Sequence, residues 1–246
     1  IGRGTGVLYQ LYHLFKGNSI IKLSIHQFKV HLDTIINLVR VSLGGVLQFA
    51  VASLSWIFIM RVMADFGSEA LAGYTIAIRI IIFCILPAWG ISNAAATLVG
   101  QNLGADKPER AEKSVWIATK YATAFLLILG ILFFLFANQS IAFFNDDLEV
   151  ISIGSEGLKI FCIGYVFFAS GMVITAAFNG AGDTMTPMFF NLICFWLIQI
   201  PLAYLLANSL EWGPNGVFWA VTISETILAA LAIFWFRKGK WKEAKI

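Results

Sequence analysis

Long apolar segments constrain this chain more than any other feature of its sequence. Six stretches of about 20 or more mostly apolar residues are separated by short polar segments. A stretch of that length can cross a bilayer as a helix, because a helix satisfies its own backbone hydrogen bonds in lipid. Only 13% of the 246 residues are charged, whereas soluble domains carry roughly 25%. We predict an all-α fold, a polytopic membrane helix bundle with six transmembrane helices at Val41–Ala64, Ala70–Val99, Ser114–Asn138, Gly157–Asn179, Pro187–Asn208 and Pro214–Phe236.

The distribution of charge predicts how these spans are oriented. Basic residues concentrate before the first span, after the second and after the last, whereas the other loops are acidic. Positive loops face the cytoplasm in membrane proteins. We therefore expect a multi-pass protein of the cell membrane with a cytoplasmic C-terminus. The residues concerned are Lys16, Lys22, Lys29, Arg40, Lys107, Arg110, Lys113, Arg237, Lys238, Lys240, Lys242 and Lys245 on the basic side, and Asp65, Glu69, Asp146, Asp147, Glu149 and Glu211 on the acidic side.

The region before the first span has a different pattern. Between residues 20 and 40, apolar residues recur at steps of three and four, with polar residues on the other face. This pattern predicts an amphipathic helix at the membrane surface, or a linker helix packed on the bundle. We expect four parts: 1–15, the end of a truncated preceding transmembrane helix; 16–40, a cytoplasmic interlobe helix; 41–236, the six-helix lobe; and 237–246, a basic cytoplasmic tail. Since the chain starts at Ile1 rather than Met, we expect a longer protein.

Two of the charged residues within the predicted spans stand out. Arg79 is in the second span and Glu225 is near the middle of the last. Charges in hydrocarbon are costly, so an intramembrane charge is a candidate functional site. Glu225 is predicted to bind a proton or cation, or else to form a structural pair with Arg79 or with neighbouring hydroxyl groups.

Uncharged polar and aromatic residues within the spans are candidates for the wall of a substrate cleft. We select Gln48, Trp56, Tyr74 and Asn179. Aromatic rings attract organic cations, and a few placed polar groups orient a ligand in an apolar pocket. Such polar residues also serve as ordinary interhelical hydrogen-bonding groups.

The sequence offers little support for enzymatic chemistry. Gly100–Gly104 is not followed by the Gly-Lys-Ser/Thr of a phosphate-binding loop, and no nucleophilic triad is apparent. Cys84, Cys162 and Cys194 lie within apolar spans and are predicted to be packing residues. We predict no enzyme activity, no cofactor, no metal site and no nucleic-acid partner.

Three motifs carry a resemblance to a known family. They are Ala94–Ala111 (AAATLVGQNLGADKPERA), Phe178–Pro187 (FNGAGDTMTP) and Gly213–Ala220 (GPNGVFWA). Their order and spacing resemble the MATE (multidrug and toxic compound extrusion) transporters, and the resemblance covers essentially the whole chain. The resemblance implies that this chain is the C-terminal six-helix lobe of a twelve-helix transporter, whose other lobe is the N-terminal partner.

The family resemblance also implies a mechanism. Inward flow of sodium ions or protons would drive export of organic cations or drugs from the cell. Some members carry coupling carboxylates in the seventh and tenth helices, but Ala52 and Phe168 stand at about those places here. Glu225 is then the leading local candidate for ion coupling. A lipid-linked oligosaccharide flippase of the same broad superfamily and a non-transporting truncated membrane protein are the alternatives.

Overall fold

The computed structural model describes residues 2–16 and 31–243 of the chain. Residues 1–40 and residues 41–246 form two separate compact units. In the first unit, α1 spans Gly2–Lys16, and most of the predicted interlobe segment, residues 17–30, lies outside the described residues.

The long helix α2 spans Leu32–Ala64 and includes the expected boundary between residues 40 and 41. It runs without a break through residue 40, where a separate surface helix was expected to end and the first span to begin. No proline interrupts this stretch, and helix extension costs little once a helix has started. Amphipathic and apolar patterns therefore follow each other on one helix.

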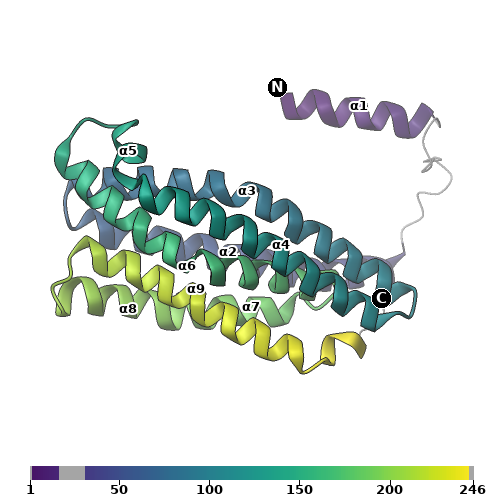
Figure 1. Ribbon diagram of the computed structural model, residues 1–246. Coiled ribbons are helices and arrows are strands. Elements are labelled where there is room, and N and C mark those ends of the chain that lie inside the picture. The colour runs from purple at the N-terminus through teal and green to yellow at the C-terminus, as the bar shows by residue number, and fades with distance from the viewer. Residues whose placement is uncertain (1, 17–30, 244–246) are drawn as a thin grey trace. The chain divides into compact units, whose positions relative to one another are not determined.

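Six helical segments are long and apolar enough to span a membrane, within the part of the chain that the structure describes. This confirms the predicted all-α bundle (Figure 1). The segments are Ser42–Ala64 of α2, α3 at Ser68–Gly104, α4 at Pro108–Leu135, α6 at Leu148–Gly180, the composite segment Met185–Ser209, and α9 at Pro214–Arg237.

Helix α6 lies at the centre of the bundle, in contact with α3, α4 and α9. Small residues allow the close approach. A Cβ atom on Gly73 of α3 would lie 2.9 Å from the backbone nitrogen of Gly154 in α6, and a Cβ on Gly157 would overlap the buried ring of Phe218 in α9. Packing through glycine is a common way for membrane helices to associate, since lipid provides no hydrophobic drive between them.

A short helix, α5, covers one end of the bundle. It spans Ala137–Ala142 and packs mainly on α6 (Figure 1). The chain then turns, and Asp147 caps the start of α6 by accepting hydrogen bonds from the backbone N–H groups of Glu149 (2.8 Å) and Val150 (3.2 Å).

The fifth membrane segment is irregular. It consists of α7 (Met185–Asn191), the π-helical turns η2 (Leu192–Gln199), α8 (Ile200–Tyr204) and the π-helical turns η3 (Leu205–Ser209). Pro201 is the second residue of α8, just after η2. Its ring crowds the carbonyl four residues earlier and lacks an N–H, and wider turns relieve that crowding. The sequence predicted one span here but not its widened turns.

The C-terminal segment folds back on the start of α4. In the short helix η4 (Lys240–Glu243), the Lys242 Nζ atom lies 2.6 Å from Glu112 Oε2. Trp241 stacks on Phe236 with ring centroids 4.6 Å apart. Glu112 lies in the second turn of α4. The basic loop after α3 and the basic tail therefore share one end of the bundle.

Candidate substrate cavity

Two adjoining cavities are walled by α2, α3, α6, α9 and the fifth membrane segment. The first has a volume of about 140 Å³ and is mostly apolar. Its walls are Trp56, Ile78, Ile81, Ile82, Ile85, Phe161, Gly164, Tyr165, Phe168, Val221, Thr222 and Glu225.

The second cavity is larger, about 380 Å³, and carries more amide and hydroxyl groups. It is lined by Gln48, Ile85, Trp89, Ser92, Asn93, Phe168, Met172, Thr175, Ala176, Asn179, Asn191, Phe195, Glu225 and Leu228.

Glu225 lies where the two cavities meet. It lines both, together with Ile85 and Phe168, and it is the only carboxylate among the described residues that line them. The neighbouring Ser224 Oγ donates a hydrogen bond of 2.9 Å to Gln199 Oε1, which holds α9 against the end of η2. An ionised carboxylate in such surroundings is stabilised by any cation that enters.

The structure brings together two residues that the sequence selected separately. Asn179 Nδ2 donates to Gln48 Oε1 at 3.3 Å, although 131 positions separate them in the chain. Both line the second cavity. Asn191 Nδ2 also donates to the backbone oxygen of Gln48 at 3.4 Å. An amide cluster from three helical segments therefore forms one wall.

Several buried oxygens around these cavities have no hydrogen-bond partner within the described part of the chain. They include Asn179 Oδ1, Ser92 Oγ and Thr175 Oγ1 in the second cavity and Thr222 Oγ1 in the first. Buried polar groups normally find a partner, so an exception calls for an explanation. Water or a ligand within the cavities would supply the missing hydrogen bonds.

Polar contacts between α2 and η2 position the α2 side chains at the cavities. Ser55 Oγ donates to the Phe195 carbonyl at 3.2 Å, and Trp196 Nε1 donates to the Val51 carbonyl at 3.0 Å. The Phe58 and Trp196 rings meet edge to face at 5.6 Å. On the same helix, Trp56 lines the first cavity.

Tyr74 lies elsewhere. It is only 2% exposed, its ring lies 5.6 Å from that of Phe218, and it lines neither cavity. This side chain belongs to the packed contact between α3 and α9. The sequence could not reveal this, because it does not specify how a helix is rotated about its axis.

The predicted Arg79–Glu225 pair is absent from the structure. Among the described residues, the only ion pair within 4.0 Å joins Lys242 to Glu112. Arg79 is exposed and lines a different cavity, with residues of α4 and α5. The reason is helical phase: at about 100° per residue, Arg79 lies on a different face of α3 from the isoleucines that line the first cavity.

Sequence reasoning missed most of the wall, including Ser92, Thr175 and Met172. One position of the wall had been indicated by the sequence. This is Phe168, where the family resemblance led us to look for a carboxylate. Its aromatic ring lines both cavities. An aromatic face therefore stands where some relatives of that family would carry a charge.

The MatE family model matches residues 45–205, which include α3, α4, α6 and most of α2. The chain belongs to the MATE family. This confirms the resemblance carried by the three motifs. Because this is a family of transporters, membership also confirms that the chain is a multi-pass membrane protein and not an enzyme.

Curated relatives from this MATE family include bacterial proteins named for drug resistance. The chain is 28% identical over 210 residues to "Probable multidrug resistance protein NorM" of Thermotoga maritima, covering 85% of this chain and 45% of the relative. It is 22% identical over 246 residues to "Probable multidrug resistance protein YpnP" of Bacillus subtilis, covering 100% and 54%. The chain spans about half the length of these relatives.

Solved MATE structures share the fold. "Crystal structure of MATE in the straight conformation" superposes with a TM-score of 0.89 at 22% identity, over 98% of this chain and 55% of that one. "Outward-facing conformation of a multidrug resistance MATE family transporter of the MOP superfamily" gives 0.88 at 22% identity, over 97% and 54%. The bundle thus matches one half of a MATE transporter.

Proposed function

We propose that this chain is the C-terminal lobe of a cation-coupled antiporter that exports organic cations, with its C-terminus in the cytoplasm. The observation that carries the proposal is Glu225, which lines two adjoining cavities and is the only carboxylate to do so in the described part of the chain. The half-length match to multidrug resistance proteins supports a partner lobe N-terminal to this one in the intact protein. The loop Lys107–Lys113 and the basic tail lie at the same end, as the positive-inside rule requires.

The wall chemistry suits an amphipathic cation. Glu225 supplies the counter-charge, the rings of Trp56 and Phe168 supply polarisable faces, and the unpartnered oxygens of Ser92 and Thr175 supply hydrogen-bond acceptors. A sodium ion or proton at Glu225 would compete with the substrate for the same negative charge. Exchange of one for the other links ion entry to substrate release, because each ligand favours the orientation that it binds more tightly.

The cavities favour a cation over an anionic lipid-linked oligosaccharide. Neither Lys nor Arg occurs among the described residues that line them. A diphosphate group would lack a positive partner there and would face Glu225. Arg79, the basic residue singled out within the predicted spans, lines another cavity.

The test is efflux of a fluorescent organic cation, ethidium, from cells that express the intact protein. Glu225→Gln preserves the size of the side chain and removes its charge, and Glu211→Gln in an exposed loop is the matched control. We expect efflux to fall at least tenfold in the first variant and to stay unchanged in the second. Full efflux by folded Glu225→Gln protein would refute the assigned role.

The same assay identifies the coupling ion. Loss of efflux on removal of sodium indicates sodium coupling, and loss with a protonophore indicates proton coupling. No efflux by the unsubstituted, intact and folded protein would favour the non-transporting alternative.

A further inference from the structure

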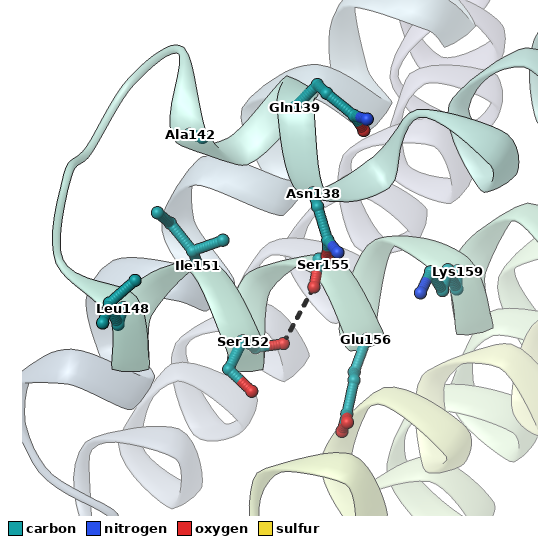
Figure 2. A pocket seen from close by; sticks show the side chains of 9 residues that line it. All are labelled: Asn138, Gln139, Ala142, Leu148, Ile151, Ser152, Ser155, Glu156 and Lys159. Carbon is teal, nitrogen blue, oxygen red and sulfur yellow. Dashed lines mark hydrogen bonds between the residues drawn. The ribbon is translucent and has the colours of Figure 1, made fainter.

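A separate cavity lies outside the candidate substrate site, at the end of the bundle covered by α5. It has a volume of about 510 Å³ and is bounded by α5 on one side and the first three turns of α6 on the other. Figure 2 shows Asn138 of α5 directed towards Ser155 of α6, with Glu156 and Lys159 following along α6. Its walls are Asn138, Gln139, Ala142, Leu148, Ile151, Ser152, Ser155, Glu156 and Lys159.

The cavity presents one positive and one negative group. Lys159 and Glu156 are three residues apart on α6, so they are neighbours on the helix surface, yet they form no ion pair within 4.0 Å in the described structure. Glu156 Oε2 accepts a hydrogen bond of 2.6 Å from Asn215 Nδ2 of α9, which fixes the carboxylate and leaves its second oxygen available. Asn138 and Gln139 add amide groups opposite.

An apolar groove adjoins this polar cavity one helical turn further along α6. It lies between α4 and α6 and is lined by Leu127, Gly130, Ile131, Phe134, Leu135, Cys162 and Ile163. Ile163, four residues beyond Lys159, is 51% exposed, and Ile131 is 55% exposed. The polar groups thus stand above a strip of exposed hydrocarbon surface on the same side of the bundle.

Lys159 lies at about the same height along the bundle as a second basic residue, Arg79. Gly73 and Gly154 touch where α3 and α6 pack together, so the two helices have a common reference point there. Arg79 is six residues beyond Gly73, and Lys159 is five residues beyond Gly154. Each lies against α5, Arg79 beside Ser140 and Phe143 and Lys159 beside Asn138 and Gln139. Each is the twelfth residue of its helix, and a long basic side chain can extend along apolar surface from there towards the headgroup level.

We propose that this cavity binds the headgroup of an amine-bearing glycerophospholipid, phosphatidylethanolamine, from the leaflet at the α5 end of the bundle. The lipid phosphate contacts Lys159, and its ammonium contacts the free oxygen of Glu156. One acyl chain lies along the groove at Ile163 and Ile131. The two opposite charges, close together on one helix face, match a headgroup whose phosphate and ammonium are joined by two methylene groups, and the adjoining groove accounts for the chain.

The experiment measures binding of the first lipid to the intact, delipidated protein by native mass spectrometry. Phosphatidylethanolamine is compared with phosphatidylglycerol, which has the phosphate but no ammonium. Soluble glycerophosphoethanolamine, which has the headgroup but no acyl chains, is added as a competitor. We expect phosphatidylethanolamine to bind at least fivefold more tightly than phosphatidylglycerol and the soluble headgroup to compete poorly.

Variants assign the contacts. Lys159→Gln is expected to weaken phosphatidylethanolamine binding about fivefold, the effect of one basic residue near a membrane surface, and Lys159→Arg is expected to preserve it. Glu156→Gln should abolish the preference over phosphatidylglycerol. Lys120→Gln, which removes an exposed lysine of α4 away from the cavity, is the matched control and should have no effect.

Three outcomes would overturn the proposal. The first is equal binding of the two lipids by the unsubstituted protein, a result that does not depend on any variant folding. The second is competition by the soluble headgroup as strong as that by the lipid, which would indicate a site for small phosphates. The third is an equal loss of binding in Lys159→Gln and Lys120→Gln, which would indicate a general effect of charge. None of them bears on ethidium efflux, so the proposed transport function is tested separately.

Discussion

Replacing Gly180 by alanine should force apart two helices at the point where two of the family motifs meet. Gly180 ends α6 in the motif Phe178–Pro187, and Ala96 of α3 lies in the motif Ala94–Ala111. A Cβ atom on Gly180 would lie 2.7 Å from Ala96 Cα and 2.8 Å from its carbonyl carbon, and closer still to its carbonyl oxygen. Carbon atoms pack best at about 3.5–4.0 Å, so the backbones would have to separate by about 1 Å.

The obstacle at this contact is backbone, which cannot move aside as a flexible side chain can. Overpacking of this kind costs about 1–3 kcal/mol, and we expect the upper part of that range. At about 2–4 °C per kcal/mol for a domain of this size, the melting temperature should fall by roughly 5–10 °C. The assay is the fraction of intact, detergent-solubilised protein that remains monodisperse after heating.

Two other glycines complete the series. A Cβ on Gly100 would lie 3.2 Å from the Gly180 carbonyl oxygen, so Gly100→Ala should cost less than about 1 kcal/mol. A Cβ on Gly104 would meet nothing within 4 Å, and Gly104→Ala should leave the melting temperature unchanged or slightly raised. If Gly180→Ala melts no lower than Gly104→Ala, the argument from close approach is wrong.

Three further predictions concern individual side chains: two contacts that are present and one pair that is absent from the described residues. Trp196→Phe removes the hydrogen bond to the Val51 carbonyl and should lower the free energy of unfolding by about 1 kcal/mol. The control is Trp212→Phe at an exposed position. Equal melting temperatures of the two variants would contradict the role of that hydrogen bond. Because Arg79 and Glu225 line different cavities, the losses of stability caused by Arg79→Ala and Glu225→Gln should add to within about 0.5 kcal/mol in the double variant. A double variant more stable than Arg79→Ala alone would restore the pairing hypothesis. The Lys242–Glu112 pair is partly exposed, with 27% and 33% of the two side chains accessible, so Lys242→Gln should cost less than about 1 kcal/mol. A cost clearly above that value would show that this pair is not a partly screened surface contact.

Patterns that run along the chain predicted much of the architecture. The six spans, their all-helical nature and the shared end of the basic loop and tail follow from residue order alone, because transfer of a segment into a bilayer depends mainly on its summed hydrophobicity. The motifs around Gly100 and Gly180 indicated the family, and the structure gives them a physical reason: these two glycines allow α3 and α6 to touch. Nothing in the sequence indicated the widened turns of η2, because a proline such as Pro201 is equally compatible with an ordinary kinked helix.

The candidate site depended on information that the sequence does not contain. The sequence determined that Gln48, Asn179, Tyr74, Arg79 and Glu225 lie in membrane helices, but their side chains could have faced lipid, a neighbouring helix or a cavity. These spans are apolar on all faces, so no hydrophobic stripe reveals how each is rotated. Only the tertiary packing decided that Gln48 meets Asn179, that Tyr74 is buried against Phe218, and that Glu225 lines two cavities while Arg79 lines another. At about 100° of rotation per residue, a small change in helix phase exchanges a cavity residue for a packing residue, and glycine contacts between helices set that phase.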